Sequence, residues 1–237
     1  MLTKPETGDI QTLKNLWKSV FKDTDEYINL FFNYKFDFEK TFVYKTDSKI
    51  VSALYYFDVI LTNGCNEFKA AYICGIATLP AMRGKGIAGK LIEACIGELK
   101  EKDYDIALLI PADESLFNYY KKFGFNKFSY ISCWESDYNN TVKPESKTLI
   151  VKRTAEDIKL LKECYGFPIV KKGISYYKTN ENEYTAMEYT EQPGFFNGKT
   201  VRTAYNPQCS NSFPFSAAIN FKNIELPEKK YINLLLN

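Results

Sequence analysis

The sequence predicts a mixed α/β fold in which helices cover a sheet, and three observations lead to this prediction. Two amphipathic helical segments open the chain, strand-like apolar runs follow them, and a glycine-rich turn then leads into a third helix. After that turn the helical and strand periods alternate, which is typical of layered α/β proteins. The chain has 237 residues, of which 45% are hydrophobic and 16% aromatic. It can therefore bury a substantial core, and its length fits one or two domains.

The first two elements are predicted to be helices. Between Thr7 and Phe21, apolar side chains recur at helical spacing and share one face: Ile10, Leu13, Leu16, Trp17 and Val20. A second helix is expected from about Asp25 to Phe36, with an inward face that is largely aromatic: Tyr27, Leu30, Phe31 and Tyr34. Core packing is the expected role of most of these rings, because they follow the helical period. The alternative, which stays open, is that some of the rings of this segment line an acceptor pocket: Tyr27, Phe31, Phe32, Tyr34 and Phe36.

Three strands are expected next, at Thr41–Lys45, Ile50–Leu61 and Phe68–Leu79. They are separated by two turns, Asp47-Ser48 and Asn63-Gly64. The third run is apolar almost throughout, so it is predicted to be a central strand covered on both faces.

A glycine-rich turn, Arg83–Gly89, comes after Pro80 and passes directly into a helix. Apolar residues keep the 3.6-residue period of that helix from Ile87 to about Lys102. The unit is completed by a strand at Ile106–Ile110, a helix at Ser115–Phe123 that ends at Gly124, and a strand at Phe125–Trp134.

The polar segment Ser136–Lys147 is expected to be a linker, which divides the chain into two domains, 1–136 and 149–237. A faint repeat relates the two at a constant offset: Asp9-Ile10, Leu13-Lys14 and Trp17 match Asp157-Ile158, Leu161-Lys162 and Tyr165. Two interpretations stay open, a degenerate duplication and a chance likeness of two amphipathic helices. Further strands are expected around Tyr184–Thr190 and Lys199–Tyr205.

The composition excludes several functional classes. The chain has no histidine, which removes Ser-His-Asp and Cys-His hydrolases and every His-ligated metal site, and no metal is expected. Lys plus Arg number 31 and Asp plus Glu 29, so the net charge of +2 gives no reason to expect nucleic acid or an anionic membrane as a partner. No apolar run reaches the ~20 residues that span a bilayer.

The six cysteines show no CxxC spacing. Several lie in apolar runs, where a free thiol packs as a small hydrophobe, and no signal peptide is apparent at the amino terminus. The sequence therefore predicts reduced thiols and a cytoplasmic location rather than a disulfide framework.

The glycine-rich turn carries the strongest chemical signal. A helix start offers unpaired N–H groups and the positive end of the helix dipole, and glycines let a phosphate approach the backbone closely. Arg83 and Lys85 add positive charge there. The turn lacks the Gly-Lys-Ser/Thr of a P-loop and matches the dinucleotide-binding pattern only weakly. A tight strand-to-helix turn without a ligand therefore stays an alternative.

Beyond this chemistry, the segment Ile76–Ile92 resembles the acetyl-coenzyme A motif of the GNAT superfamily of N-acetyltransferases. That motif is a strand followed by Gln/Arg-x-x-Gly-x-Gly/Ala, and here it is Arg83-Gly84-Lys85-Gly86-Ile87-Ala88. A second family signature, a Tyr at the end of a short helix before Gly-Phe, is similar to Leu116–Phe125 with its Tyr120. The approach Cys74-Gly75-Ile76 is most similar to the enhanced-intracellular-survival branch. The resemblance implies the GNAT fold, a mixed and mostly antiparallel sheet flanked by helices, followed by a smaller degenerate GNAT-like unit.

The resemblance also implies acetyl-coenzyme A as co-substrate and direct transfer of its acetyl group to an amine. The pantetheine arm would pair with the end of the strand, and the amides of the turn would hold the pyrophosphate. The implied cofactor-binding residues are Ile76, Ala77, Thr78, Arg83, Gly84, Lys85, Gly86, Ile87 and Ala88. Tyr120 holds the position of a general acid, because a phenol with a pKa near ~10 stays protonated beside a thiol with a pKa near ~8.5. Core packing is the expected role of its neighbour Tyr119.

The general base is not apparent from the sequence. Many relatives carry a Glu at the position of Cys74, and a buried thiol is a poor base. Five candidates stay open: Glu67, Asp58, Glu114, a water, and the carboxyl terminus of Asn237, which is thought to act as the base in the branch named above.

Because no base is apparent, a non-catalytic regulatory module that binds acetyl-coenzyme A is the alternative function. A plain packing domain without a ligand is a third interpretation. For an enzyme, the partner is a small-molecule or peptide amine, and the second domain is expected to cover the acceptor side. No nucleic acid and no membrane are expected as partners, and a homo-oligomer stays open.

Overall fold

The computed structural model describes residues 1–135, 149–171, 174–181, 183–189, 200–204, 212–227 and 230–231. The α-helices in these residues are α1 (Ile10–Phe21), α2 (Asp25–Tyr34), α3 (Ile87–Glu101), α4 (Leu116–Lys121) and α5 (Ala155–Tyr165). Short 3-10 helices lie at Thr7–Asp9, Phe38–Lys40 and Pro80–Met82. The strands are β1 (Leu2–Thr3), β2 (Thr41–Thr46), β3 (Lys49–Thr62), β4 (Glu67–Thr78), β5 (Ile106–Leu109), β6 (Asn126–Glu135), β7 (Leu149–Lys152), β8 (Ile169–Lys171), β9 (Ile174–Asn180), β10 (Glu183–Tyr189), β11 (Thr200–Ala204), β12 (Ser212–Asn220) and β13 (Lys230–Tyr231).

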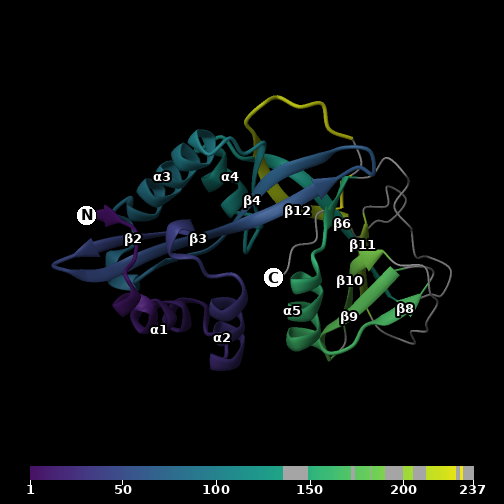
Figure 1. Ribbon diagram of the computed structural model, residues 1–237, viewed down its shortest axis with the longest axis horizontal. Helices are drawn as coiled ribbons and strands as arrows, with labels where there is room; N and C mark the ends of the chain where they lie inside the picture. The colour runs from purple at the N-terminus through teal and green to yellow at the C-terminus, as the bar shows by residue number, and fades with distance from the viewer. Residues whose placement is uncertain are drawn as a thin grey trace.

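The strands of the described residues form one sheet in the order β1-β2-β3-β4-β5-β12-β6-β11-β10-β9-β8, and β7 pairs with both β3 and β13. Most neighbours are antiparallel, whereas β4 and β5 run parallel. Figure 1 shows α1 and α2 on one face of the sheet and α3 and α4 on the other. The predicted fold class, a mixed and mostly antiparallel sheet flanked by helices, is therefore confirmed, and the predicted elements up to residue 134 agree with the structure within a few residues.

The core lies on both faces of β3 and β4, as the apolar character of these strands predicts. Side chains alternate along β3, so Tyr55 packs with Trp17 and Phe31 beneath α1 and α2. Tyr56, the next residue, faces the opposite layer, where it packs with Leu91 and Cys95 of α3. This alternation explains why two neighbouring tyrosines are both buried in separate clusters.

A β-bulge at Gly75 separates β4 into two parts. Tyr55 pairs with Cys74 but Ala53 pairs with Ala77, so one extra residue of β4 lies between these pairs. Gly75 has a φ of 57°, and a Cβ there would lie 2.6 Å from Cζ3 of Trp17 and 2.7 Å from Cδ2 of Tyr55. Only glycine fits this combination of positive φ and close approach. The bulge therefore depends on Gly75.

Strands β4 and β5 diverge just before the bulge. Their pairing runs only from Ala70–Ile106 to Tyr72–Leu108. Among the described residues, no other strand takes the place of β5 along the rest of β4. The backbone edge from Ile73 to Thr78 is consequently open on that side, and this opening positions the site described below.

The carboxyl-terminal part of the chain completes the sheet and packs against α2. Strand β12 lies between β5 and β6, far from both in sequence. Helix α5, which carries the second copy of the predicted repeat, contacts α2 through an ion pair of 2.5 Å between Lys35 and Asp157, both largely buried. Tyr34 also donates a hydrogen bond of 2.5 Å to Glu163. The predicted linker, Ser136–Lys147, falls outside the described residues, and the division into two domains stays a prediction.

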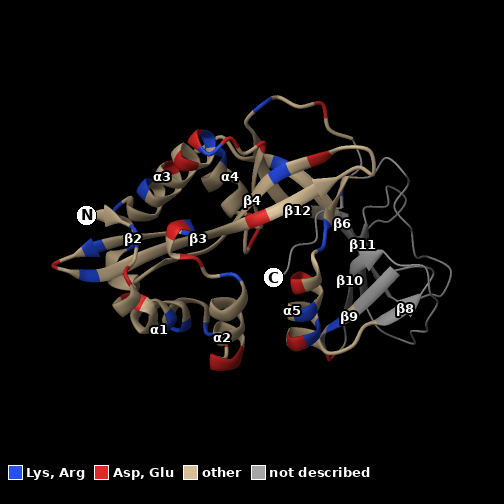
Figure 2. Cartoon of the chain, viewed as in Figure 1, with Lys and Arg blue, Asp and Glu red and all other residues tan. Residues whose placement is uncertain are grey.

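Charged side chains of both signs are interspersed over the described part of the chain. Figure 2 shows basic and acidic residues interspersed along α3 and α5, in keeping with the net charge of +2. None of the described helices is long and apolar enough to cross a membrane.

Candidate active site

The glycine-rich turn forms directly after the open edge of β4. Its 3-10 helix ends at Arg83, whose Nε donates a hydrogen bond of 3.2 Å to the carbonyl of Thr78. Gly84 and Gly86 adopt φ values of 75° and 72°, in the left-handed region that favours glycine. No atom lies within 4 Å of the position that a Cβ would take at either glycine. The backbone of the turn is therefore uncovered.

Helix α3 begins at Ile87 with Gly86 as its N-cap, and no side chain caps it. Its first internal hydrogen bond runs from the amide of Lys90 to the carbonyl of Gly86, at 3.2 Å. The amides before Lys90 are therefore free of helical partners and carry the positive end of the dipole of a 15-residue helix. Exposed Lys85 adds a charge beside them. This geometry suits an anionic group such as a phosphate.

The end of β4 is held firmly on its β3 side. The hydroxyl of buried Ser52 donates to the carbonyl of Ala77 at 2.7 Å and lies 2.8 Å from the hydroxyl of Thr78. The predicted residues Ile76, Ala77 and Thr78 thus form a fixed strand with one open edge. Such an edge can pair with an extended molecule that carries amides.

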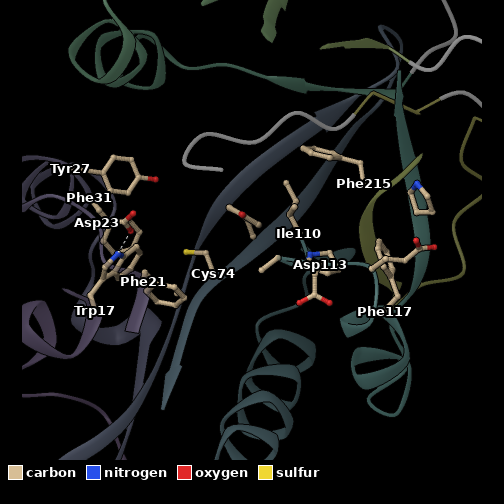
Figure 3. Close-up of a pocket in the computed structure, with 16 residues that line it drawn as sticks. Trp17, Phe21, Asp23, Tyr27, Phe31, Cys74, Ile110, Asp113, Phe117 and Phe215 are labelled. Atoms are coloured by element: carbon tan, nitrogen blue, oxygen red, sulfur yellow. Dashed lines mark hydrogen bonds between the residues drawn. The ribbon is translucent and has the colours of Figure 1, made fainter. Parts of the chain in front are cut away.

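A cavity of about 690 Å³ lies where β4 and β5 diverge. Figure 3 shows its two sides: Trp17, Phe21, Tyr27 and Phe31 on one, and Ile110, Phe117 and Phe215 on the other. Its lining comes from five separate segments: Trp17, Phe21, Asp23, Tyr27 and Phe31; Tyr72, Cys74 and Gly75; Ile110 to Glu114; Phe117; and Pro214 and Phe215. Seven of these side chains are aromatic, and the volume is that of a small-molecule site.

The charged residues that line the cavity are all acidic, among the residues that the structure describes. Asp113 accepts hydrogen bonds from the amide and hydroxyl of Ser115 at the start of α4, and these bonds hold its pKa below the ordinary value. Glu114 lies 3.8 Å from the ammonium of Lys127. Asp23 accepts a 2.7 Å hydrogen bond from the indole of Trp17, and no described cation pairs with it. Asp113 also lacks a described cation but is exposed, whereas Asp23 is half-buried, so a cationic ligand would stabilise Asp23 most.

Tyr120, the predicted acid, lies on α4 outside the cavity lining, with its ring 5.3 Å from that of Tyr119 and 6.1 Å from that of Phe125. Burial, followed by Tyr119 and Asp113, raises the pKa of Tyr120 to about 12. Tyr120 in turn helps to raise the pKa of Tyr72, after burial and Cys74, so the two phenols interact. Tyr72 lines the cavity, whereas Tyr120 packs in the cluster on the α3 side of the sheet.

The structure separates the candidate bases. Glu67 begins β4, at the end away from the bulge, and pairs with Lys152 at 2.5 Å. Asp58 holds Lys40 at 2.8 Å and the hydroxyl of Tyr104; burial raises its pKa, but these partners outweigh burial and lower it. Glu114 is the one of these three that lines the cavity. Asn237 lies outside the described residues.

Two residues of the cavity lining differ in whether the sequence analysis identified them: it considered Cys74 and did not consider Asp23. Cys74 lines the cavity, and burial raises the pKa of its thiol far above the ordinary value, so it stays neutral and is a poor base or nucleophile. Asp23 was missed by sequence reasoning, because an acidic residue between two helices is typical of capping. Its position two residues before an aromatic helix face was the one available signal.

Comparison with known proteins addresses the family and the fold. Residues 2–128 match the family model of an acetyltransferase (GNAT) domain. The chain is similar to a conserved protein of unknown function from Enterococcus faecalis V583, with 11% identity and a TM-score of 0.69 over 92% of this chain and 72% of that one. It is also similar to a GCN5-related N-acetyltransferase from Anabaena variabilis ATCC 29413, with 15% identity and a TM-score of 0.68 over 93% and 72%.

A third similar structure is Eis1 from Mycobacterium abscessus, with 9% identity and a TM-score of 0.66 over 92% of this chain and 72% of that one. Identities this low establish the fold alone. No curated protein matches the sequence. The resemblance to the GNAT superfamily, drawn from the two sequence motifs, is confirmed by the family model.

Proposed function

Because this chain belongs to the GNAT acetyltransferase family, we propose that it transfers the acetyl group of acetyl-coenzyme A to an amine. One observation carries the proposal: the open edge of β4 leads from the glycine-rich turn at Thr78 to the cavity at Cys74. An extended cofactor lying along this edge reaches from an anion-binding helix start to an aromatic cavity.

The cofactor side uses the backbone more than side chains. The amides of the pantetheine arm pair with the edge of β4 as an added strand would. The pyrophosphate lies at the uncapped start of α3. The proposed binding residues are Ile76, Ala77, Thr78, Arg83, Gly84, Lys85, Gly86, Ile87 and Ala88. Among them Arg83 also braces the turn, since its Nε is bonded to Thr78.

The acetyl thioester then lies at the cavity, where the acceptor amine attacks its carbonyl carbon. The acceptor binds as an ammonium and first loses one proton to solvent, which gives the neutral amine that attacks. The new N–C bond then forms, the C–S bond breaks, coenzyme A leaves as a thiolate, and the nitrogen loses its second proton. Tyr120 donates a hydrogen bond to the departing sulfur. A phenol whose pKa is about 12 stays protonated at neutral pH, and complete transfer of its proton to a thiolate is uphill, because a thiol has a pKa near ~8.5. The thiolate therefore takes its proton from solvent.

The acceptor side uses side chains. Asp23 receives the ammonium of the acceptor, because it is half-buried and has no described cation, whereas the cavity carboxylates Asp113 and Glu114 are exposed. Glu114, on the opposite side of the cavity, takes the proton directly or through a water. Both assignments follow from position in the cavity and charge.

The test is a thiol-release assay with acetyl-coenzyme A and a panel of primary amines, comparing wild type with Tyr120→Phe. Loss of the hydrogen bond is expected to lower kcat about 100-fold with little change in either KM. Tyr119→Phe is the matched control and is expected to keep wild-type turnover. Full activity of Tyr120→Phe would remove Tyr120 from the mechanism. Binding of coenzyme A without turnover of any amine would favour the regulatory module instead.

A further inference from the structure

One aromatic side of the cavity comes from the carboxyl-terminal part of the chain, through Phe215 of β12. This residue follows β6 by some 80 positions in sequence but lies beside it in the sheet. It therefore brings a side chain to the site that the GNAT domain match over residues 2–128 does not contain.

A bulge turns Phe215 out of the regular ladder. Pro214 pairs with Tyr130 and Ser216 pairs with Ser129, so Phe215 is an extra residue without a partner on β6. Proline suits this place because it has no N–H to contribute to the ladder. Immediately beyond the bulge, the buried hydroxyls of Ser129 and Ser216 lie 2.6 Å apart and fix β12 to β6. The direction of the Phe215 side chain is thus built into the strand pairing.

Strand β5, the neighbour of β12, ends two residues short of the position opposite Phe215. β12 pairs with β5 from Asn220 to Ala217, opposite Ile106 to Leu109. At Ile110 the chain leaves the sheet and lines the cavity. Phe215 and Ile110 consequently stand together on the side of the cavity away from Trp17 and Phe31 (Figure 3).

The charges of the cavity restrict what can lie between these two sides. Asp113 and Glu114 are exposed to solvent, whereas Asp23 is half-buried beside Trp17 and has no described cation, so Asp23 is the carboxylate that gains most from a bound cation. A single ammonium satisfies Asp23, and the remaining aromatic lining is covered best by an apolar body.

From these observations we propose that Phe215 determines acceptor specificity: it selects primary monoamines that carry an aromatic or branched apolar group, by packing against that group while Asp23 holds the ammonium. This inference rests on the proposed acetyl transfer and names its substrate class. Phe215 lines the cavity, whereas no residue of the glycine-rich turn does, so its effect is expected on the amine.

The experiment compares kcat/KM for 2-phenylethylamine, ethanolamine and spermidine in the wild type and in Phe215→Ala. Wild type is expected to prefer 2-phenylethylamine by tenfold or more. Phe215→Ala is expected to lose about tenfold for this amine, through KM. Activity with ethanolamine and the KM for acetyl-coenzyme A are expected to stay within about twofold. Phe167→Ala is the control, because Phe167 belongs to the same part of the chain but is 86% exposed.

Phe215→Leu, which keeps apolar bulk, is expected to retain intermediate preference and guards against a variant that does not fold. Equal loss for all three amines in both variants, or a wild-type preference for spermidine, would overturn the inference. Calorimetric titration of each amine into the protein saturated with coenzyme A separates the two proposals. Selective binding of 2-phenylethylamine that Phe215→Ala abolishes would uphold the role of Phe215 even if no acetyl transfer occurred, whereas turnover without selectivity would uphold only the transfer.

Discussion

The proposed cofactor side and the acceptor cavity are built in opposite ways. The cofactor side is a single run of chain, from the open edge of β4 through the turn into α3, and it presents mainly backbone groups. The cavity is assembled from α1, α2, β4, the 110–114 segment, α4 and β12, and it presents side chains. A constant co-substrate can be recognised by a fixed backbone, whereas the choice of acceptor resides in side chains that differ more readily between proteins. Gly75 belongs to both regions, because it lies in the open edge of β4 and also lines the cavity.

The largest effect on stability is expected from Gly75→Ala, because Gly75 belongs both to the cofactor side and to the cavity. The added Cβ would collide with Trp17 and Tyr55, and the residue would keep an unfavourable positive φ. The free energy of unfolding is expected to fall by about 3 kcal/mol, as urea titration can measure. Gly97→Ala provides the contrast, because Gly97 lies inside α3 with open space around it. That change is expected to stabilise the protein by ~0.5–1 kcal/mol. Equal behaviour of the two variants would show that the bulge does not require glycine.

The next effect separates the acceptor cavity from the cofactor side. Asp23→Asn removes the charge that receives the ammonium, and the KM for the amine is expected to rise roughly 10- to 30-fold. The KM for acetyl-coenzyme A is expected to stay unchanged. Asp25→Asn is the control, since exposed Asp25 pairs with Lys18 at the surface. A rise in both KM values would contradict the separation of the two regions.

A smaller effect is expected on the cofactor side alone. Gly86→Ala places a methyl group in the uncovered turn and disfavours its left-handed φ, so the affinity for coenzyme A is expected to fall about tenfold. Gly166→Ala serves as the control, because Gly166 also has a positive φ and open surroundings but ends α5. Calorimetric titration of coenzyme A should therefore distinguish the two variants, although both lose some stability. An equal loss of affinity would point to general strain rather than to a phosphate site.

The smallest effect concerns the attachment of α5 to α2. Burial raises the pKa of Asp157, but the hydrogen bond from Lys35 and those within Thr154–Asp157 outweigh it and lower the pKa below the ordinary 3.8. The folded state therefore binds this proton more weakly than the unfolded state. The contribution to stability is present above about pH 4 and disappears as the pH falls through the folded pKa. Urea unfolding should show an acid-dependent loss on the order of 1 kcal/mol that Asp157→Asn lacks. An identical pH profile in Asp157→Asn would contradict this account.

The contrast between the two regions also explains what the sequence could predict. The run Arg83–Ala88 was recognisable because its chemistry is local: glycines, a helix start and a 3.6-residue period lie next to one another. The cavity depends on which distant segments meet. From the sequence alone, Asp23 resembles a helix-capping residue, and only the packing of α1 against β4 brings it to the cavity. Phe215 was not predicted because β12 contains Pro214, and a proline within an apolar run argues against a strand.

The same reasoning applies to Gly75. In the sequence it belongs to the segment Cys74-Gly75-Ile76 that precedes the motif, but its structural role cannot be recognised there. Its necessity follows from the slip in register between β3 and β4 and from two rings that approach it from other elements. Register slips arise from tertiary pairing and leave no mark in hydrophobic periodicity. The element types were predictable, and the positions where they deviate from regularity were not.

The most direct test of the central claim is amide hydrogen exchange with and without coenzyme A. Binding along the open edge of β4 and at the start of α3 is expected to slow exchange in peptides that contain residues 73–78 and 84–89. Strands β8 to β10, far along the sheet, are expected to stay unchanged. Slower exchange confined to these two segments would support the account. Protection elsewhere, or no protection of either segment at saturating coenzyme A, would contradict it.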